Sequence, residues 1–283
     1  MTFPKALILF FCLFALVSVA SAVAEPNFED QALKLRESVL LRVEPRMVQA
    51  PLVQQGRGAQ LRAGNSRRYP WKNNIVTTVF WIGESATVNN PVPNTKSSWD
   101  ASWVKSYGGH DNPDPRFRRG YIPARFIPRQ NPFYVALPYN DVTKGTTKPE
   151  APRVIPWFRE SFVKKGQTVC KGRWVVVRHG RREAYGQWED CGPFRTDHWQ
   201  YVFGNQRPLP NLNQGAGLDV SPAIRDMLGM KGKDVCDWRF VEFREVPRGP
   251  WTLYGDNNTF VQQRRRGDVR FAGTASRPDS RSY

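Results

Sequence analysis

The sequence predicts a mainly β fold, a small barrel or sandwich with long loop insertions and short helices, flanked by flexible termini. Two observations lead to this prediction. Short strand-like runs separated by proline, glycine and asparagine fill the middle of the 283-residue chain. The composition, 40% hydrophobic and 13% aromatic, is sufficient for the core of one large domain or two small ones.

The first 24 residues have the anatomy of a secretory signal peptide. Lys5 precedes an apolar run over 6–20, and Ala22-Val23-Ala24 forms a cleavage site before Glu25; a rival site ends two residues earlier. The apolar run is too short for an ordinary membrane-spanning helix. We therefore expect a secreted or periplasmic protein without a membrane span.

The rest of the chain divides into three predicted parts. An amphipathic helix over 28–43 and a basic linker occupy residues 25–72, the barrel domain occupies 73–250, and a disordered basic tail occupies 251–283. Two long insertions interrupt the domain, at 84–131 and 195–216.

The strand-like runs follow one another along the domain, at 75–82, 133–137, 153–158, 173–178, 185–190 and 238–246. One helix is also well defined. Ser221 is a good N-cap, Pro222 suits the first helical position and Gly229 can end the helix. Asp219 would then leave a strand end beside the helix N-terminus, where backbone N–H groups favour negative charge.

The first insertion carries aromatic residues at helical spacing. Trp99, Trp103 and Tyr107 recur every four residues and would share one helical face. Such a stripe could stack against sugars, but it more often packs against the body of the protein. The segment 110–114 is rich in proline, asparagine and aspartate, which favours turns over a cation-binding loop.

Removal of the leader leaves three cysteines in an oxidising compartment. The residue numbers of two residues that face each other across a hairpin add up to a constant, which is about 362 for a turn centred on residue 181. Cys170 and Cys191 sum to 361, so we expect a disulfide between them, with Cys236 free and buried. Three unpaired thiols, or a bridge that includes Cys236, are the alternatives.

The charge balance favours anionic partners. The chain has 42 Lys and Arg against 25 Asp and Glu, a formal net charge of +17. Nucleic acid is an unsuitable partner for an exported chain, despite the run Arg264-Arg265-Arg266. No spacing typical of a zinc site is present, and we expect a monomer with no metal and no cofactor.

Three segments resemble the rare lipoprotein A (RlpA)-like family and occur in that family's order. Asp190 to Phe194 is similar to its Asp-x-Gly-Pro-Phe strand end, and Leu218 to Ala223, preceded by Gly217, is similar to its Ile-Asp-Leu-Ser-x-x-Ala helix entry. Phe133 to Pro138 resembles its Ala-His-x-x-Leu-Pro segment. The resemblance covers about residues 75–250, apart from the two insertions.

The resemblance implies a six-stranded double-psi β-barrel with a polysaccharide groove, as in plant expansins and MltA-type lytic transglycosylases. In lytic members an aspartate and a histidine are functional, and these map onto Asp190 and Tyr134. The related barrels also have an aspartate at the position of Asp219. Tyr134 replaces the histidine; it can donate a hydrogen bond, but its ordinary pKa of about 10 makes it a poor base at neutral pH.

Asp190 and Asp219 are the predicted catalytic residues, because cleavage of a glycosidic bond needs a carboxylic acid that protonates the leaving oxygen. Asp141 is a third candidate, His198 could replace the missing histidine, and Trp199 lies beside it. The predicted substrate-binding residues are Tyr134, Asp141, His198 and Trp199. Each aspartate also has a structural interpretation: a helix cap at Asp219, binding of backbone amides by Asp190 and a turn at Asp141.

Two functions remain open. In the first, an exported protein binds and remodels peptidoglycan or a related cell-wall polysaccharide through a groove that holds Asp190 and Asp219, using exposed tryptophans and basic charge. In the second, a lytic transglycosylase or glycoside hydrolase cleaves the same polymer by aspartate acid and base catalysis. The missing histidine and the long insertions favour binding or an altered activity.

Overall fold

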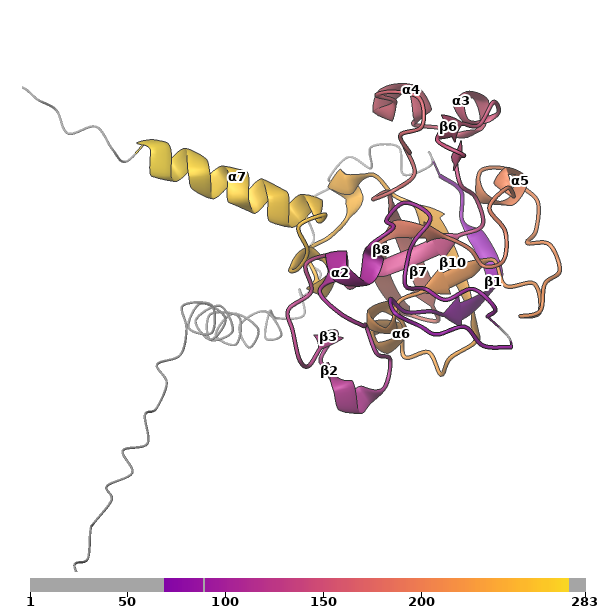
Figure 1. Ribbon diagram of the computed structural model, residues 1–283, viewed down its shortest axis with the longest axis horizontal. Coiled ribbons are helices and arrows are strands. Elements are labelled where there is room, and N and C mark those ends of the chain that lie inside the picture. Colours follow the sequence, from indigo (N-terminus) through magenta and orange to yellow (C-terminus); the bar gives the residue numbers. More distant parts are fainter. Residues whose placement is uncertain (1–68, 89, 275–283) are drawn as a thin grey trace, which may run out of the picture. The chain divides into compact units, whose positions relative to one another are not determined.

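The computed structural model describes residues 69–88 and 90–274. The predicted signal peptide, the helix over 28–43, the linker up to residue 68 and the last residues of the tail, 275–283, lie outside the described residues. The described part is mainly β with short helices, as the sequence predicts, and one longer helix, α7 Thr259–Thr274, near its C-terminal end (Figure 1).

Six strands close into a barrel of mixed strand directions. Their bounds are β1 Lys72–Val79, β4 Tyr134–Leu137, β7 Trp174–His179, β8 Arg182–Cys191, β9 Leu218–Val220 and β10 Asp234–Phe240. The order around the barrel is β1-β10-β7-β8-β4-β9. β1 with β9 and β4 with β8 are parallel pairs, and the other neighbours are antiparallel. Closure gives every barrel strand a partner on both sides.

Five of the six predicted strand runs contribute barrel strands, and one is wrong. The run over 153–158 forms two short helices instead, α3 Ala151–Val154 and α4 Phe158–Ser161. Pro152 suits the first turn of α3, and Pro156 cannot donate a ladder hydrogen bond. The sixth barrel strand is β9, whose three residues are too few for a period-two pattern to be visible in the sequence.

β7 and β8 form the predicted hairpin, and the residue numbers of each pair of facing residues add up to 361. The predicted disulfide is nevertheless wrong, because Cys170, Cys191 and Cys236 are all free thiols. The ladder ends before it reaches the first two cysteines. The chain turns at Cys170, whose carbonyl accepts a hydrogen bond from Arg173 N at 3.1 Å, and β8 leaves the hairpin register at a bulge beyond Trp188.

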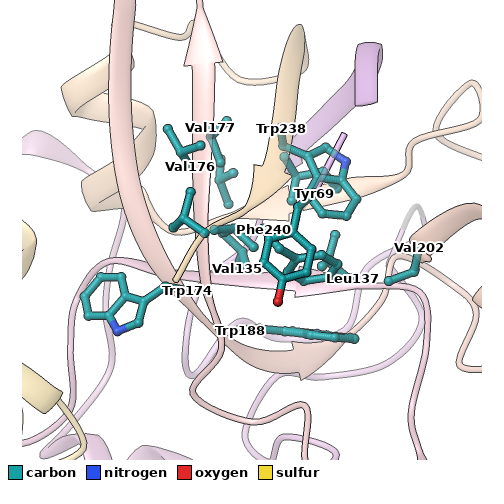
Figure 2. Packing of buried hydrophobic residues seen from close by; sticks show 14 of the residues in the cluster. Tyr69, Val135, Leu137, Trp174, Val176, Val177, Trp188, Val202, Trp238 and Phe240 are labelled. Carbon is teal, nitrogen blue, oxygen red and sulfur yellow. The ribbon is translucent and has the colours of Figure 1, made fainter. Parts of the chain in front are cut away.

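The barrel interior is filled with aromatic and β-branched side chains (Figure 2). Trp188 on β8 and Trp238 on β10 are fully buried, and their ring centroids lie 5.8 and 5.1 Å from that of Phe240. Tyr69 packs edge to face on Phe240 at 6.0 Å. Edge-to-face pairs of this kind add roughly 0.5–1.5 kcal/mol to the contribution of apolar burial.

Helix α6, Pro222–Leu228, is confirmed where the sequence predicts it, and it lies against β8 (Figure 1). Ser221 Oγ accepts a hydrogen bond from Ile224 N at 3.3 Å, and Gly229 ends the helix in the left-handed conformation. The helix approaches the sheet at Gly186. A Cβ there would lie 2.7 Å from Ile224 Cδ1 and 3.1 Å from the carbonyl oxygen of Phe133, so glycine permits this close contact.

The first insertion packs on the barrel through a second aromatic cluster. It contains α2 Trp103–Tyr107, the 3-10 turn η1 Pro115–Phe117 and the short strands β2 Arg118–Arg119 and β3 Ile122–Pro123. The rings of Trp103 and Tyr107 are buried and lie 5.6 and 6.3 Å from the ring of Tyr134. Trp99 is partly buried and packs on Trp188 at 5.6 Å. The aromatic stripe therefore packs against the protein and does not form a sugar platform.

The tail that we predict to be disordered from residue 251 is ordered in its described part, which corrects the prediction. It forms the 3-10 turn η3 Pro250–Thr252 and helix α7 Thr259–Thr274. Trp251, Tyr254 and Val261 are buried, and the ring of Trp251 lies 5.9 Å from that of Phe133. Phe260 adds a further contact, since its ring lies 4.5 Å from that of Phe243 and 5.7 Å from that of Trp174.

The remaining described elements are short: β5 Val142–Thr143, β6 Thr146–Thr147, α5 Trp199–Val202 and the 3-10 turn η2 Phe243–Glu245. In the part of the chain that the structure describes, each helix is too short or too polar to cross a lipid bilayer.

The close contact between α6 and β8 predicts a coupled pair of substitutions. Gly186→Ala should destabilise the protein by about 1–3 kcal/mol, because its methyl group crowds Ile224 Cδ1. Ile224→Val removes that atom and alone should cost roughly 0.5–1.5 kcal/mol. Urea denaturation of both single variants and the double variant measures the coupling. Strictly additive losses would contradict the packing described here.

Candidate functional site

A groove of about 1340 Å³ lies where the ends of β1, β4, β8 and β9 meet. Parts of the segments 84–98 and 230–233 form its walls. We call it the main groove; the lining residues that matter most are Glu84, Ser98, Ala136, Asp190, Phe194 and Asp219. Pockets for drug-sized ligands measure about 300–1,000 Å³. The main groove therefore has room for an oligomeric ligand.

Strand β4 holds the two predicted catalytic aspartates on either side of one alanine. Ala136 is the register partner of Asp190 in the parallel ladder with β8 and of Asp219 in the antiparallel ladder with β9. Neighbouring strands are about 4.8 Å apart, so the two aspartate Cα atoms are about 10 Å apart and their side chains share one face of the sheet. The small side chain of Ala136 leaves space between the carboxyl groups.

A bulge in β8 gives Asp190 this position. Val135 pairs with Trp188, the next residue of β4 pairs with Asp190, and Glu189 is the extra residue between them. An extra residue reverses the alternation of side chains along a strand. Because of it, Trp188 stays in the barrel core while Asp190 faces the main groove.

The Asp190 carboxylate is held by two backbone amides. Its Oδ1 atom accepts hydrogen bonds from Ser98 N and from Cys191 N, both at 2.7 Å. The side chain is buried, with 7% of the residue exposed. Burial raises the pKa of Asp190 to about 6, although the two amides oppose this shift.

Asp219 is the more strongly perturbed of the two acids. Its Oδ1 atom accepts a hydrogen bond from Thr78 Oγ1 on β1. A Cβ on Gly192 would lie 3.5 Å from Asp219 Oδ2, which places the end of β8 directly beside this carboxyl group. Burial, aided by the negative charges of Glu84 and Asp190, raises the pKa of Asp219 to about 7, although the hydrogen bond from Thr78 opposes this shift.

Glu84 is a third carboxyl group in the main groove that sequence reasoning missed. Its Oε2 atom accepts a hydrogen bond from Asn94 Nδ2 at 2.7 Å, and burial raises its pKa. Glu84 reaches the groove from the first insertion. No spacing or motif in the sequence places it near Asp219, so only the folded structure could identify it.

Tyr134, which stands at the histidine position of the family that the sequence resembles, does not line the main groove. It is buried, its hydroxyl donates to Asp111 Oδ2 at 2.9 Å, and it accepts from Ile82 N at 3.1 Å. Asp111 also pairs with the buried guanidinium of Arg118 at 2.6 Å. Burial raises the pKa of Tyr134 well above its ordinary value. The tyrosine thus anchors the first insertion to β4.

The other predicted substrate-binding residues also lie outside the lining of the main groove. Asp141 is buried, and its carboxylate accepts hydrogen bonds from Thr168 Oγ1 at 2.6 Å and Val169 N at 2.7 Å. His198 is buried beside Tyr201, and Trp199 packs against the main core. The side chains of these three residues are occupied in packing and hydrogen bonding outside the groove.

Glu189, the extra residue of the bulge, is a buried carboxyl group that does not line the groove. Its Oε1 atom accepts a hydrogen bond from Asn257 Nδ2 at 3.0 Å, and burial raises its pKa to about 7. Folding therefore disfavours the ionisation of Glu189, as it does that of the carboxyl groups in the groove.

Within residues 69–88 and 90–274, no three His, Cys, Asp or Glu side chains are arranged to hold a metal ion. No protein-family model matches the sequence. No curated protein matches it significantly.

The raised pKa of Asp219 predicts a pH-dependent stability. Between about pH 4 and 7 the folded protein keeps a proton on Asp219 that the unfolded chain releases, so this group's contribution to stability falls as pH rises. Asp219→Asn should therefore gain roughly 1–3 kcal/mol relative to the parent between pH 5 and pH 8. Chemical denaturation at both pH values measures this difference. Asp197→Asn, at an exposed position, serves as the control, and a parallel shift in both variants would contradict the prediction.

Proposed function

We propose that the protein is exported, binds a cell-wall polysaccharide such as peptidoglycan in the main groove, and cleaves its glycosidic bonds. The observation that carries this proposal is the placement of Asp190 and Asp219 on either side of Ala136, in one groove, with a raised pKa on each. The barrel's two parallel ladders are compatible with a double-psi barrel, and with the resemblance to the RlpA-like family. That resemblance supports a glycan as the substrate.

The hydrogen-bond partners of the two aspartates divide the chemical roles, because two backbone amides stabilise the carboxylate of Asp190 whereas, among the described residues, Asp219 accepts only from the hydroxyl of Thr78. With a pKa of about 7, Asp219 keeps its proton in a large fraction of molecules near neutral pH and can donate it to the leaving glycosidic oxygen. Asp190, with a pKa of about 6, is more often ionised and can stabilise the positive charge that develops on the sugar ring as the C–O bond breaks. A hydroxyl of the substrate or a water molecule then attacks the anomeric carbon and gives its proton to the Asp219 carboxylate.

The absence of histidine from the groove lining fits this division of roles. Tyr134, the residue at the histidine position, is buried and hydrogen-bonded to Asp111. The group that assists Asp219 in the groove is therefore Asp190. Lytic transglycosylation needs only one group that acts first as acid and then as base, because the sugar's own hydroxyl is the nucleophile. Asp219 fits that requirement.

A second candidate function is non-catalytic binding of the same polymer. Phe194 lines the main groove with 42% of its surface exposed, at the groove edge that follows Pro193. Trp81 lines the groove as well. Exposed aromatic rings can stack on the apolar faces of sugars. A protein that only binds the cell wall would need these rings, but it would not need Asp190 and Asp219 to gain or lose a proton.

Release of soluble fragments from purified sacculi tests cleavage. Asp219→Asn should lower the release rate at least about 100-fold, because the general acid is lost. The parent's rate should decline above about pH 7, as Asp219 loses its proton, and below about pH 6, as Asp190 gains one. Asp197→Asn is the control and should retain activity. A parent protein that releases no fragments would refute cleavage and favour non-catalytic binding.

Binding to the same sacculi tests the aromatic edge. Phe194→Ala should weaken binding about three- to tenfold, the loss expected when one stacked ring is removed. Phe162→Ala is the matched control, since Phe162 has 41% of its surface exposed and does not line the main groove. Co-sedimentation with sacculi measures both affinities. Equal losses in the two variants would place the aromatic contact elsewhere.

A further inference from the structure

We propose that Lys231 and Lys233, with Lys96 on the opposing segment, form a subsite in the main groove for carboxylate or phosphate groups carried by the polysaccharide. This inference rests on the proposed function and deepens it, because it names the substrate as an anionic glycan. All three lysines line the same groove as Asp190 and Asp219.

The loop that carries two of these lysines joins α6 to β10 and is fixed at both ends. At its start, His179 Nδ1 lies 3.2 Å from the carbonyl oxygen of Leu228, and the Arg182 guanidinium packs against Gly229. At its end, His179 Nε2 lies 3.2 Å from Asp234 Oδ2. The tip of the β7–β8 hairpin therefore holds both ends of the loop, and Lys231 and Lys233 project from a positioned segment.

The three lysines have no carboxylate partner among the described residues, whereas the other cation of the groove is engaged. Arg225 pairs with Asp226 at 2.7 Å and donates to the carbonyl oxygen of Pro113 at the same distance. Asp226 also lies 3.3 Å from Arg118 Nε. Lys96, Lys231 and Lys233 are exposed, and their charges are available to a ligand.

The acids on the groove floor do not cancel this positive charge. Glu84, Asp190 and Asp219 are each partly or largely buried, and burial raises the pKa of each. In mildly acidic solution the floor therefore carries less negative charge than three free carboxylates would, while the rim keeps its ammonium groups. A glycan bearing negative charges can then lie across the acids with its substituents beside the lysines.

Lysine favours a particular kind of ligand. An ammonium group is a compact charge on a flexible stem and binds carboxylate or phosphate without demanding one geometry. The groove is wide, and its lysines lie on two separate segments, so a polymer with repeated charges suits it better than one small anion. Carboxylated sugars and phosphate-bearing wall polymers share this chemistry, and the experiment below distinguishes them.

The test measures binding of the full chain to fluorescently labelled polygalacturonate, poly(glycerol phosphate) and neutral dextran, at low and high salt. The double variant Lys231→Glu/Lys233→Glu should lose affinity for at least one anionic polymer about tenfold or more, with a reduced dependence on salt. Lys164→Glu/Lys165→Glu makes the same change of net charge at exposed residues outside the groove lining and should lose less than about threefold. The polymer that shows the larger difference identifies the recognised group.

Equal losses in the two double variants would overturn the inference, since they would show a general effect of net charge. Tighter binding of a single-stranded oligonucleotide than of either anionic polysaccharide would also overturn it. Cleavage of unsubstituted chitooligosaccharides separates the two proposals. If Asp219→Asn abolishes this cleavage while the groove lysines prove irrelevant, only the subsite is wrong; if the parent neither binds nor cleaves any glycan, the proposed function is wrong.

Discussion

The position of β4 between β8 and β9 is the constraint on which the rest of the site depends. One backbone hydrogen-bonded ladder on each side of Ala136 fixes Asp190 and Asp219 at a separation set by strand spacing. These residues lie on different strands, and the pairing of both strands with β4 brings them together. The bulge at Glu189 is equally necessary, because without it Asp190 would face the core. The barrel thus supplies the geometry of the acid pair.

The first insertion supplies much of the environment of these acids. Ser98 N donates to Asp190, and Glu84 contributes to the raised pKa of Asp219. The insertion is held in place by buried contacts, among which the hydrogen bond from Tyr134 to Asp111 joins it to β4. A buried carboxylate beside a buried guanidinium is costly to leave unpaired, so this anchor resists local opening. Geometry and acidity therefore come from different parts of the chain.

The sequence predicted most of the barrel strands, and it predicted that Asp190 and Asp219 lie in one groove. Both predictions have identifiable physical reasons. Short strand-like runs bounded by proline, glycine and asparagine and the Ser221 cap are local signals, and the aspartates lie in segments that resemble a known family. The three-residue strand β9 is too short to show an alternating pattern, and only the Ser221 cap that follows it indicates a strand end at Asp219. The disulfide prediction followed a correct hairpin register but could not foresee where the ladder ends. Glu84 and the burial of Tyr134 depend on where a long insertion packs, which local patterns do not encode.

The buried tyrosine at β4 has a consequence for how the groove of this protein could be altered. Since the groove wall is attached through a few anchoring contacts on the insertion side, a different loop with a similar anchor could be grafted onto the same scaffold. The barrel would still fold around its tryptophan-rich interior. The pKa values of the acids and the shape of the groove would change together with the loop, without any change in the strands.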